Sequence, residues 1–349
     1  MKDLTQTKEE QMLTPAQLDD RLTAPRPALV EDLSRLDGDL LVIGAGGKLG
    51  PSLVRLAVRA LEAAGSDSRV LAVSRFATAE ARAAAEATGA VVIPADVTDD
   101  GQLTGLPEAA NVVFLVGAKF GSSGQEAATW ATNTYLPGRV AQRYAGSRLV
   151  GLSTGNVYPF TPVASGGATE ATAPQPVGDY AMSCLGRERI LTHVSEATST
   201  PTALIRLNYA VEMRYGVLVD LARMIRSGQP VDVTMGAANV VWQGYANEVI
   251  LRSLLHASVP PFVLNLTGPE TISIRRTAER LAERMHLPVE FTGAESPTAL
   301  LSDASRCHGL FGYPDTTLDE LVDLTAEWVL AGGTVHEKPT KFQQRDGKF

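Results

Sequence analysis

The sequence predicts an α/β fold, in which a doubly wound parallel sheet is followed by a smaller C-terminal lobe. Three observations lead to this class. Short apolar segments alternate with helical segments up to Arg206, a glycine-rich turn directly follows the first apolar segment, and the alternation becomes irregular after Arg206. Because parallel strands need long crossover connections, such alternation is typical of a parallel sheet that is covered by helices on both faces.

The expected elements of the first domain follow in chain order. An N-terminal helical extension covers residues 1–37, with helical spacing at 11–22 and 28–36. The dinucleotide-binding domain then covers residues 38–206. Its expected strands span residues 40–43, 70–73, 91–93, 112–116, 148–152 and 203–206, and its expected helices span 49–64, 78–88, 125–145 and 179–197.

The second half of the chain is expected to form a smaller mixed α/β substrate lobe over residues 207–335, with segments that return to the core. Helices are expected at 215–227, 249–256, 274–285 and 318–331, and a strand at 263–266. The charged segment 336–349 is expected to be a tail or an arm, which lies on the surface or on a neighbouring subunit.

Composition narrows the class of partner. The chain has 349 residues, a net charge of −8 and no long basic run, so we expect a small-molecule partner and no nucleic acid. No apolar run approaches the roughly 20 residues of a membrane span, and the first ten residues lack an apolar signal core. Two cysteines form no disulfide framework, which favours a cytoplasmic location. The histidines show no metal-ligand spacing, so no metal is expected.

The glycine-rich turn is the strongest chemical signal. Gly44, Gly47 and Gly50 have GxxGxxG spacing directly after a strand and at the start of a helix. The first glycine permits a tight turn, the second lets the backbone approach a pyrophosphate, and the third permits close helix–strand packing. The amides around Lys48 and Leu49, at the positive end of the helix, would then bind the pyrophosphate. This context predicts a Rossmann-type domain that binds NAD(P).

The end of the second strand bears on the choice of cofactor. An NAD site usually has an acidic residue there for the ribose hydroxyls, but this chain has Ser74 and Arg75. Arg75 suits a 2′-phosphate, and Lys48 could add a second positive charge, so NADP is favoured while NAD stays possible. In the alternative interpretation, both basic side chains are merely solvated.

Two further strand ends are expected to line the cofactor. Asp96 and Val97 follow the third strand, where they suit the adenine edge, although Asp96 could equally cap a turn. Gly117 ends the fourth strand, where a small residue lets the backbone run beside the cofactor.

From about Leu40 to Ala331 the chain resembles the extended short-chain dehydrogenase/reductase family, which includes sugar-nucleotide epimerases and dehydratases. The resemblance is carried by the glycine turn, the Asp96-Val97 step, Asn133 in the helix after the fourth strand, and the stretches 152–158 (LSTGNVY) and 180–184 (YAMSC). It implies hydride chemistry in which Thr154 matches the hydroxyl residue and Tyr180 the acid/base, and it places Asn133 among the cofactor-binding residues. It also implies a homodimer formed through a helical bundle.

The family has a lysine four residues after the tyrosine, where this chain has Cys184. A tyrosine has a pKa of about 10 and needs a nearby cation to act as a base near neutrality. A cysteine cannot supply that charge. Arg187, on a similar helix face, and Lys119, after the fourth strand, are the candidates to replace it. Cys184 itself would be either a small buried side chain or, less expectedly, a nucleophile.

Two hypotheses from different classes follow. The first is an NAD(P)-dependent oxidoreductase or epimerase that acts on a carbohydrate-like alcohol or ketone, with Tyr180 as acid/base. The second is a non-catalytic dinucleotide-binding sensor or scaffold, motivated by Cys184 at the lysine position. The segments 206–212 and 242–247 depart from the family pattern, so its sugar-nucleotide site cannot be transferred to this chain.

Overall fold

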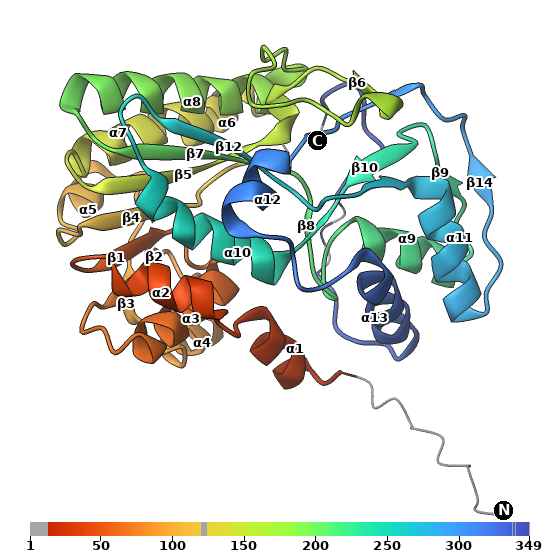
Figure 1. Cartoon of the computed structure of the whole chain (residues 1–349), viewed down its shortest axis with the longest axis horizontal. Helices are drawn as coiled ribbons and strands as arrows, with labels where there is room; N and C mark the ends of the chain where they lie inside the picture. The colour runs from red at the N-terminus through yellow and green to blue at the C-terminus, as the bar shows by residue number, and fades with distance from the viewer. Residues whose placement is uncertain (1–12, 120–123, 337, 339, 349) are drawn as a thin grey trace, which may run out of the picture.

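The central sheet confirms the predicted fold class. The structure is a computed structural model that describes residues 13–119, 124–336, 338 and 340–348 (Figure 1). Its seven-stranded sheet has the order β12-β7-β5-β4-β1-β2-β3, and all neighbouring strands are parallel. The strands are β1 (Leu40–Ile43), β2 (Val70–Ser74), β3 (Val91–Pro94), β4 (Asn111–Phe114), β5 (Arg148–Thr154), β7 (Thr202–Leu207) and β12 (Phe262–Leu266). The order reverses between β1 and β4, and this switch point opens a ligand crevice at the carboxyl ends of the strands.

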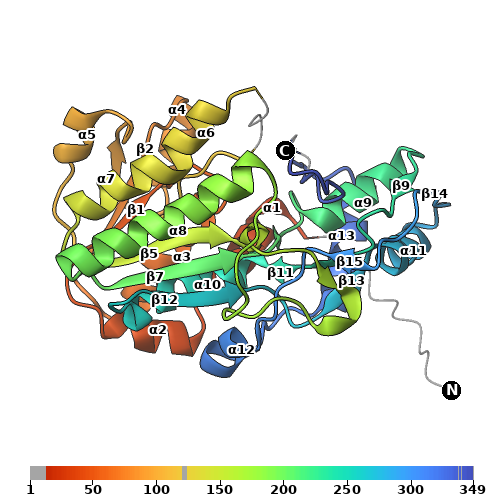
Figure 2. The same cartoon turned by 90° about the horizontal axis from the view of Figure 1, so that it is seen from above.

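Alternation of side chains along the strands creates two apolar layers. Leu41 and Ile43 of β1 belong to one cluster, which includes side chains of α7 (Leu136–Arg143) and α8 (Gly178–Thr198). Leu40 and Val42 belong to the other, which includes side chains of α2 (Pro27–Ser34), α3 (Gly50–Ala63) and α10 (Gln243–Arg252). Successive strand residues point to opposite faces, so both faces of the sheet are covered. Figures 1 and 2 show these two groups of helices on opposite sides of the sheet.

The helix expected at 125–145 is observed with an irregular centre. It consists of α6 (Glu126–Trp130), a π-helical segment (Ala131–Tyr135) and α7, and the π segment carries the fully buried Asn133. The sheet domain also contains α4 (Ala79–Glu86), which was expected, and the short α5 (Asp100–Thr104), which was not. π-Helical turns are frequent at functional sites.

The smaller lobe is built from α9 (Val217–Arg226), α11 (Ile274–Met285) and α13 (Leu318–Leu330), with four short strand pairs around them. These pairs are β8 (Ala210–Val211) with β11 (Val241–Trp242), β9 (Val231–Asp232) with β14 (Phe291–Thr292), β10 (Ala237–Asn239) with β13 (Thr271–Ser273), and β6 (Thr161–Pro162) with β15 (Thr298–Ala299). The short α12 (Ser305–Phe311) packs beside β12. None of these short strands, nor α12, was expected from the sequence.

The start of the helix expected at 249–256 was wrong. The α-helix α10 begins at Gln243, and a short 3-10 turn follows at Ser253–His256. Gln243 and Asn247 are polar, yet both are buried because their side-chain amides donate to Ser52 Oγ, at 2.9 and 2.8 Å. Because this long-range contact buries polar residues, the first turns of α10 lack the apolar spacing from which a helix is predicted.

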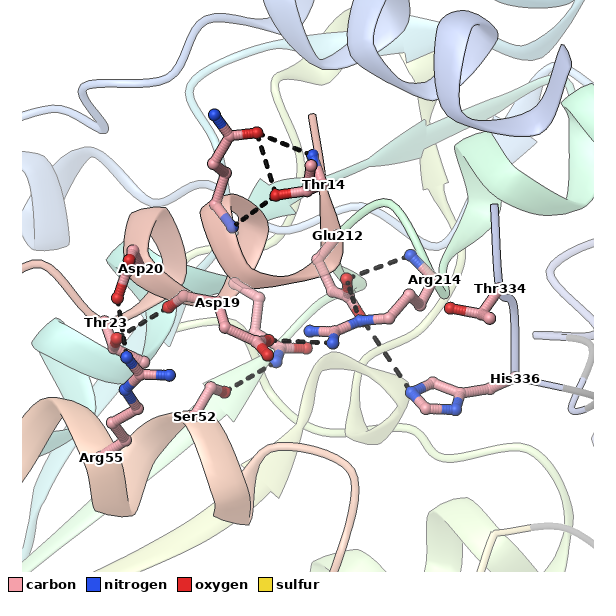
Figure 3. Close-up of polar contacts among 12 residues, drawn as sticks. Thr14, Asp19, Asp20, Thr23, Ser52, Arg55, Glu212, Arg214, Thr334 and His336 are labelled. Atoms are coloured by element: carbon pink, nitrogen blue, oxygen red, sulfur yellow. Dashed lines mark hydrogen bonds and ion pairs between the residues drawn. The ribbon is translucent and has the colours of Figure 1, made fainter. Parts of the chain in front are cut away.

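The N-terminal extension packs on the outside of the fold as expected, and it touches both lobes. Its described part contains α1 (Pro15–Leu22), of which Leu18 is fully buried, and α2. In Figure 3, Asp20 points to Arg55 of α3 and Asp19 points to Arg214 of the smaller lobe. The two ion pairs measure 2.7 and 2.9 Å. The part of this expectation that covers residues 1–12 lies outside the described residues.

The C-terminal segment is not the surface tail or intersubunit arm that was expected. His336 donates its amide to Arg214 O at 2.8 Å, and its ring points toward Glu212 in Figure 3. Thr340 and Phe342 are only 1% and 2% exposed. The segment therefore folds back onto its own chain, because Phe342 joins the apolar core and Thr340 is hydrogen-bonded. Residues 340–348 are called the C-terminal strap below.

Candidate functional site

The carboxyl ends of the strands open into one large cavity. It has a volume of about 560 Å³ and is lined by the glycine turn, by Arg75 and Asp96, and by Thr154, Tyr180 and Cys184. Val97, Ser74 and Gly117 line it as well. The structure thus gathers nearly all the predicted site residues around one space, whose volume lies in the usual range for ligand sites.

The glycine turn has the geometry expected of a phosphate turn. Gly44 has a φ of +96°, and its amide donates to Val73 O at 2.9 Å. A Cβ at Gly50 would lie 2.3 Å from Ala45 O, which is inside the contact distance of any side chain. The tight turn and the close packing of α3 therefore both require glycine, and Leu49 and Gly50 at the start of the helix line the cavity.

The far end of the cavity is formed by Arg75 and Asp96. Asp96 Oδ1 accepts hydrogen bonds from Thr98 Oγ1 at 2.7 Å and from Thr98 N at 3.0 Å. These bonds, helped by the positive charge of Arg75, lower the pKa of Asp96. Asp96 is therefore a turn-capping residue that also lines the cavity, so the two alternatives for this residue are compatible.

Lys48 differs from its expected role beside Arg75. Its Nζ donates to Ala210 O at 3.0 Å and lies 3.2 Å from the ring centroid of Tyr215, on the smaller lobe. The Lys48 side chain points toward the smaller lobe, so the expectation that its amine adds a positive charge beside Arg75 was wrong. Desolvation by the surrounding protein lowers the pKa of Lys48 to about 7, although Glu212 opposes the shift.

Tyr180 stands at the opposite end of the cavity from Arg75. It lies on α8, and its phenol is hydrogen-bonded to Thr154, the last residue of β5, and to Cys184, one turn further along α8. Burial raises the pKa of Tyr180 well above its ordinary value, and the neighbouring Cys184 raises it further. The phenol is therefore neutral at physiological pH, which is the form that donates a proton.

Cys184 is 2% exposed. Burial raises the pKa of its thiol, although Arg187 opposes the shift. A neutral buried thiol favours the interpretation of Cys184 as a small packing residue, because the thiolate is the nucleophilic form.

Two basic side chains act on Tyr180. Lys119 Nζ lies 5.9 Å from the ring centroid of Tyr180, and Arg187 acts electrostatically to lower the pKa of the same phenol. Burial lowers the pKa of Lys119 to about 8, while Cys184 and Asp220 oppose the shift. The position of both side chains agrees with the candidates named from the sequence.

Asn133 lies behind the cavity wall and contacts its lining instead of the cavity itself. Its Oδ1 accepts from Ala118 N at 2.8 Å and from Arg187 Nη2 at 2.9 Å, and its Nδ2 donates to Ala118 O and Ser183 Oγ. The side chain of Asn133 is fully buried and does not line the cavity, so the expected contact with a cofactor was wrong. Asn133 instead holds Arg187 and the segment after β4 in position.

A buried polar network beneath the site was missed in the sequence. Glu188 makes two hydrogen bonds to Arg206, at 2.7 and 3.0 Å, and accepts a third from Ser153 Oγ at 2.6 Å. Arg206 also donates to Tyr158 OH at 2.7 Å. The network ties α8 to β5 and β7 just below Tyr180. Its only sequence signal was the presence of charged residues inside otherwise apolar segments.

Other cavity residues were also missed. Asn208, Tyr209, Tyr215 and Thr340 line the cavity from the smaller lobe and the C-terminal strap. Asn208 is 4% exposed, and its Nδ2 has no hydrogen-bond partner in the structure. An unpaired buried donor on a cavity wall is suited to an oxygen atom of a ligand.

Among the described residues, no group of three or more His, Cys, Asp or Glu side chains could hold a metal ion. The described helices include none with the length and apolar character needed to span a membrane.

No protein-family model matches this sequence, and no curated protein matches it. Solved structures are nevertheless similar in fold. Pal from Bacillus thuringiensis has a TM-score of 0.70 at 18% identity, over 84% of this chain and 99% of that one. UDP-glucuronic acid 4-epimerase from Bacillus cereus, in complex with NAD, has a TM-score of 0.68 at 16% identity, over 83% and 98%. UDP-glucose 4-epimerase from Thermotoga maritima has a TM-score of 0.66 at 16% identity, over 84% and 99%. At this identity the similarity shows a shared fold.

Proposed function

We propose that this protein is an NAD(P)-dependent oxidoreductase or epimerase that acts on a carbohydrate-like alcohol or ketone. The observation that carries the proposal is the single cavity that runs from Arg75, past the glycine turn, to the Thr154–Tyr180 pair. A dinucleotide lying along it would have its pyrophosphate at the start of α3. Neighbours in fold are named as epimerases of nucleotide sugars, and some contain NAD, which supports the same class.

The residues present fit a nicotinamide dinucleotide. Gly46, Gly47 and Gly50 line the cavity, and with no side chains at these positions the backbone of the turn is accessible to a pyrophosphate. Arg75 and Ser74 favour NADP over NAD, because no acidic residue ends β2. Bound there, the nicotinamide would accept or deliver a hydride.

The chain itself would handle the proton. Tyr180 exchanges the proton of the substrate hydroxyl, and Thr154 orients both that oxygen and the phenol. Since burial keeps Tyr180 neutral, it is ready to protonate a carbonyl oxygen, and Lys119 and Arg187 favour its ionisation in the opposite direction. We therefore expect reduction to proceed at neutral pH and oxidation to accelerate as the pH rises.

The test is a Tyr180→Phe variant, assayed against a panel of sugars, polyols and sugar acids with each nicotinamide cofactor. Loss of a general acid/base typically lowers kcat by about 10²- to 10⁴-fold, while cofactor affinity should not change. Tyr313→Phe, which removes a phenol from a side chain that is 66% exposed, is the matched control. Full turnover by Tyr180→Phe would remove the assignment.

A second candidate function is a non-catalytic dinucleotide sensor or scaffold. The specific observation in its favour is Cys184, a neutral buried thiol at the position of the family lysine. Tight binding of NADP or NADPH without turnover of any substrate in the panel would support it.

We also propose a homodimer, as the family resemblance implies. A shallow apolar hollow lies on α7, α8 and the π segment, where Tyr135 is 66% exposed. Sedimentation velocity should show a dimer, which a Tyr135→Glu substitution weakens.

A further inference from the structure

The C-terminal strap is anchored across the substrate end of the molecule. At its start, Thr340 N and Oγ1 both donate to Asp220 Oδ2 of α9, at 2.7 Å. Further along, Arg345 donates to Thr298 O at 2.7 Å and to Thr298 Oγ1 at 2.8 Å, and its guanidinium lies 4.2 Å from the ring centroid of Phe160. Phe342, between these anchors, is in the apolar core. In Figures 1 and 2 the C-terminal part of the chain passes between the sheet domain and the smaller lobe.

The strap also reaches the residues around Tyr180. Lys119, whose Nζ lies 5.9 Å from the Tyr180 ring, donates to Thr340 O at 3.3 Å. At the other end of the strap, a Cβ on Gly178 would lie only 2.6 Å from Gly347 O, so the two glycines pack backbone against backbone. Gly178 begins α8, two residues before Tyr180. The strap therefore contacts elements on both sides of the proposed acid/base.

Little free space remains between the main cavity and the later residues of the strap. Asn156 and Tyr209 line the main cavity, and they also line a second void that is bounded by Gln344, Arg345 and Gly347 of the strap. This void has a volume of about 20 Å³. A cavity needs roughly 10–15 Å³ to hold one water molecule, so the void has room for about one water and no ligand.

We infer that the strap closes the substrate end of the cavity and limits the site to a small polyhydroxylated alcohol or ketone without a nucleotidyl tail. The inference rests on the proposed function and names its substrate class. Asn208, with its unpaired Nδ2 on the cavity wall, supplies a donor for one oxygen of such a substrate. A nucleotidyl tail that extended past Asn156 and Tyr209 would meet Arg345 and Gly347.

The experiment compares the full chain with an Arg345→Ala variant, which loses the anchor to Thr298. Lys348→Ala is the matched control, because its side chain is in the same strap but 77% exposed. Calorimetry first establishes cofactor binding for each protein. Conversion of free sugars, polyols and sugar acids, and separately of UDP-glucose and UDP-glucuronic acid, is then followed by absorbance at about 340 nm and by NMR of the sugar.

We expect the full chain and Lys348→Ala to convert the best free compound more than tenfold more efficiently than either UDP-sugar. Arg345→Ala should lower the preference for free over nucleotide-linked substrates at least tenfold. Conversion of a UDP-sugar by the full chain, at an efficiency within tenfold of the best free compound, overturns the inference and leaves the proposed function intact. An unchanged preference in Arg345→Ala also overturns it. Cofactor binding without conversion of either class overturns both the inference and the proposed function.

Discussion

Gly50 offers the sharpest test of the phosphate turn. An alanine Cβ at this position would lie 2.3, 2.5 and 2.7 Å from the O, C and Cα atoms of Ala45. These are backbone atoms of the turn, held in place because Ala45 N donates to Val73 O at 3.1 Å. Since they cannot rotate away, the helix must shift relative to β1.

The expected cost follows from overpacking, which typically amounts to about 1–3 kcal/mol. Alanine is favoured over glycine inside a helix by about 1 kcal/mol, which reduces the loss but does not reverse it. The net loss is therefore up to about 2 kcal/mol. In a chain of this size, about 2 °C of Tm per kcal/mol gives a decrease of up to about 4 °C. The shift of α3 should also weaken binding of NADP, because the amides that face the pyrophosphate move with the helix.

Thermal unfolding and calorimetric titration with NADP measure the two effects. Gly309→Ala is the matched control, because Gly309 is also helical but a Cβ there meets no atom within 4 Å. That substitution should be neutral or stabilising, by up to about 1 kcal/mol. If Gly50→Ala were as stable as the control and bound NADP unchanged, the close packing of α3 on the turn would be irrelevant and the reasoning would fail.

Three further predictions concern charged groups. Arg75→Ala should weaken NADP binding by about 10- to 100-fold, the loss of one charged hydrogen bond, with NAD affinity unchanged in calorimetry; an equal loss for both cofactors would contradict a 2′-phosphate contact. Glu188→Gln should lower the free energy of unfolding in urea by about 3–5 kcal/mol, because it leaves Arg206 buried without its counter-charge; a double Glu188→Leu, Arg206→Met variant should lose less. Burial lowers the pKa of Lys119 in the folded protein to about 8, from an unperturbed value of 10.5. Between these two pH values the unfolded chain binds more protons at Lys119 than the folded chain does. The free energy of unfolding therefore rises with pH across that window. Lys119→Met should remove that rise when urea unfolding is compared at the two ends of the window, and an identical pH dependence in wild type and variant would refute it.

The local pattern was sufficient for the sheet domain and for most helices. Short apolar runs located β1, β2 and β5 to within two residues, and the bounds of α11 were predicted exactly as Ile274–Met285. Apolar periodicity works there because each element buries one face against a continuous core. It failed at α10, where polar residues are buried through bonds to Ser52, and at α12 and the short strand pairs, which are too brief to carry a period.

Some residues of the candidate site could be named from the sequence, and others only from the structure. Sequence reasoning alone named the glycine turn and Arg75, from their places at strand ends, and Thr154, Tyr180 and Cys184, through the family resemblance. Only the tertiary structure brought Lys119 within 6 Å of the Tyr180 ring, turned Lys48 toward the smaller lobe, and placed Thr340 of the C-terminal strap at the cavity wall. These contacts join residues far apart in the chain, so their physical basis is the packing of one element on another, which no local spacing encodes.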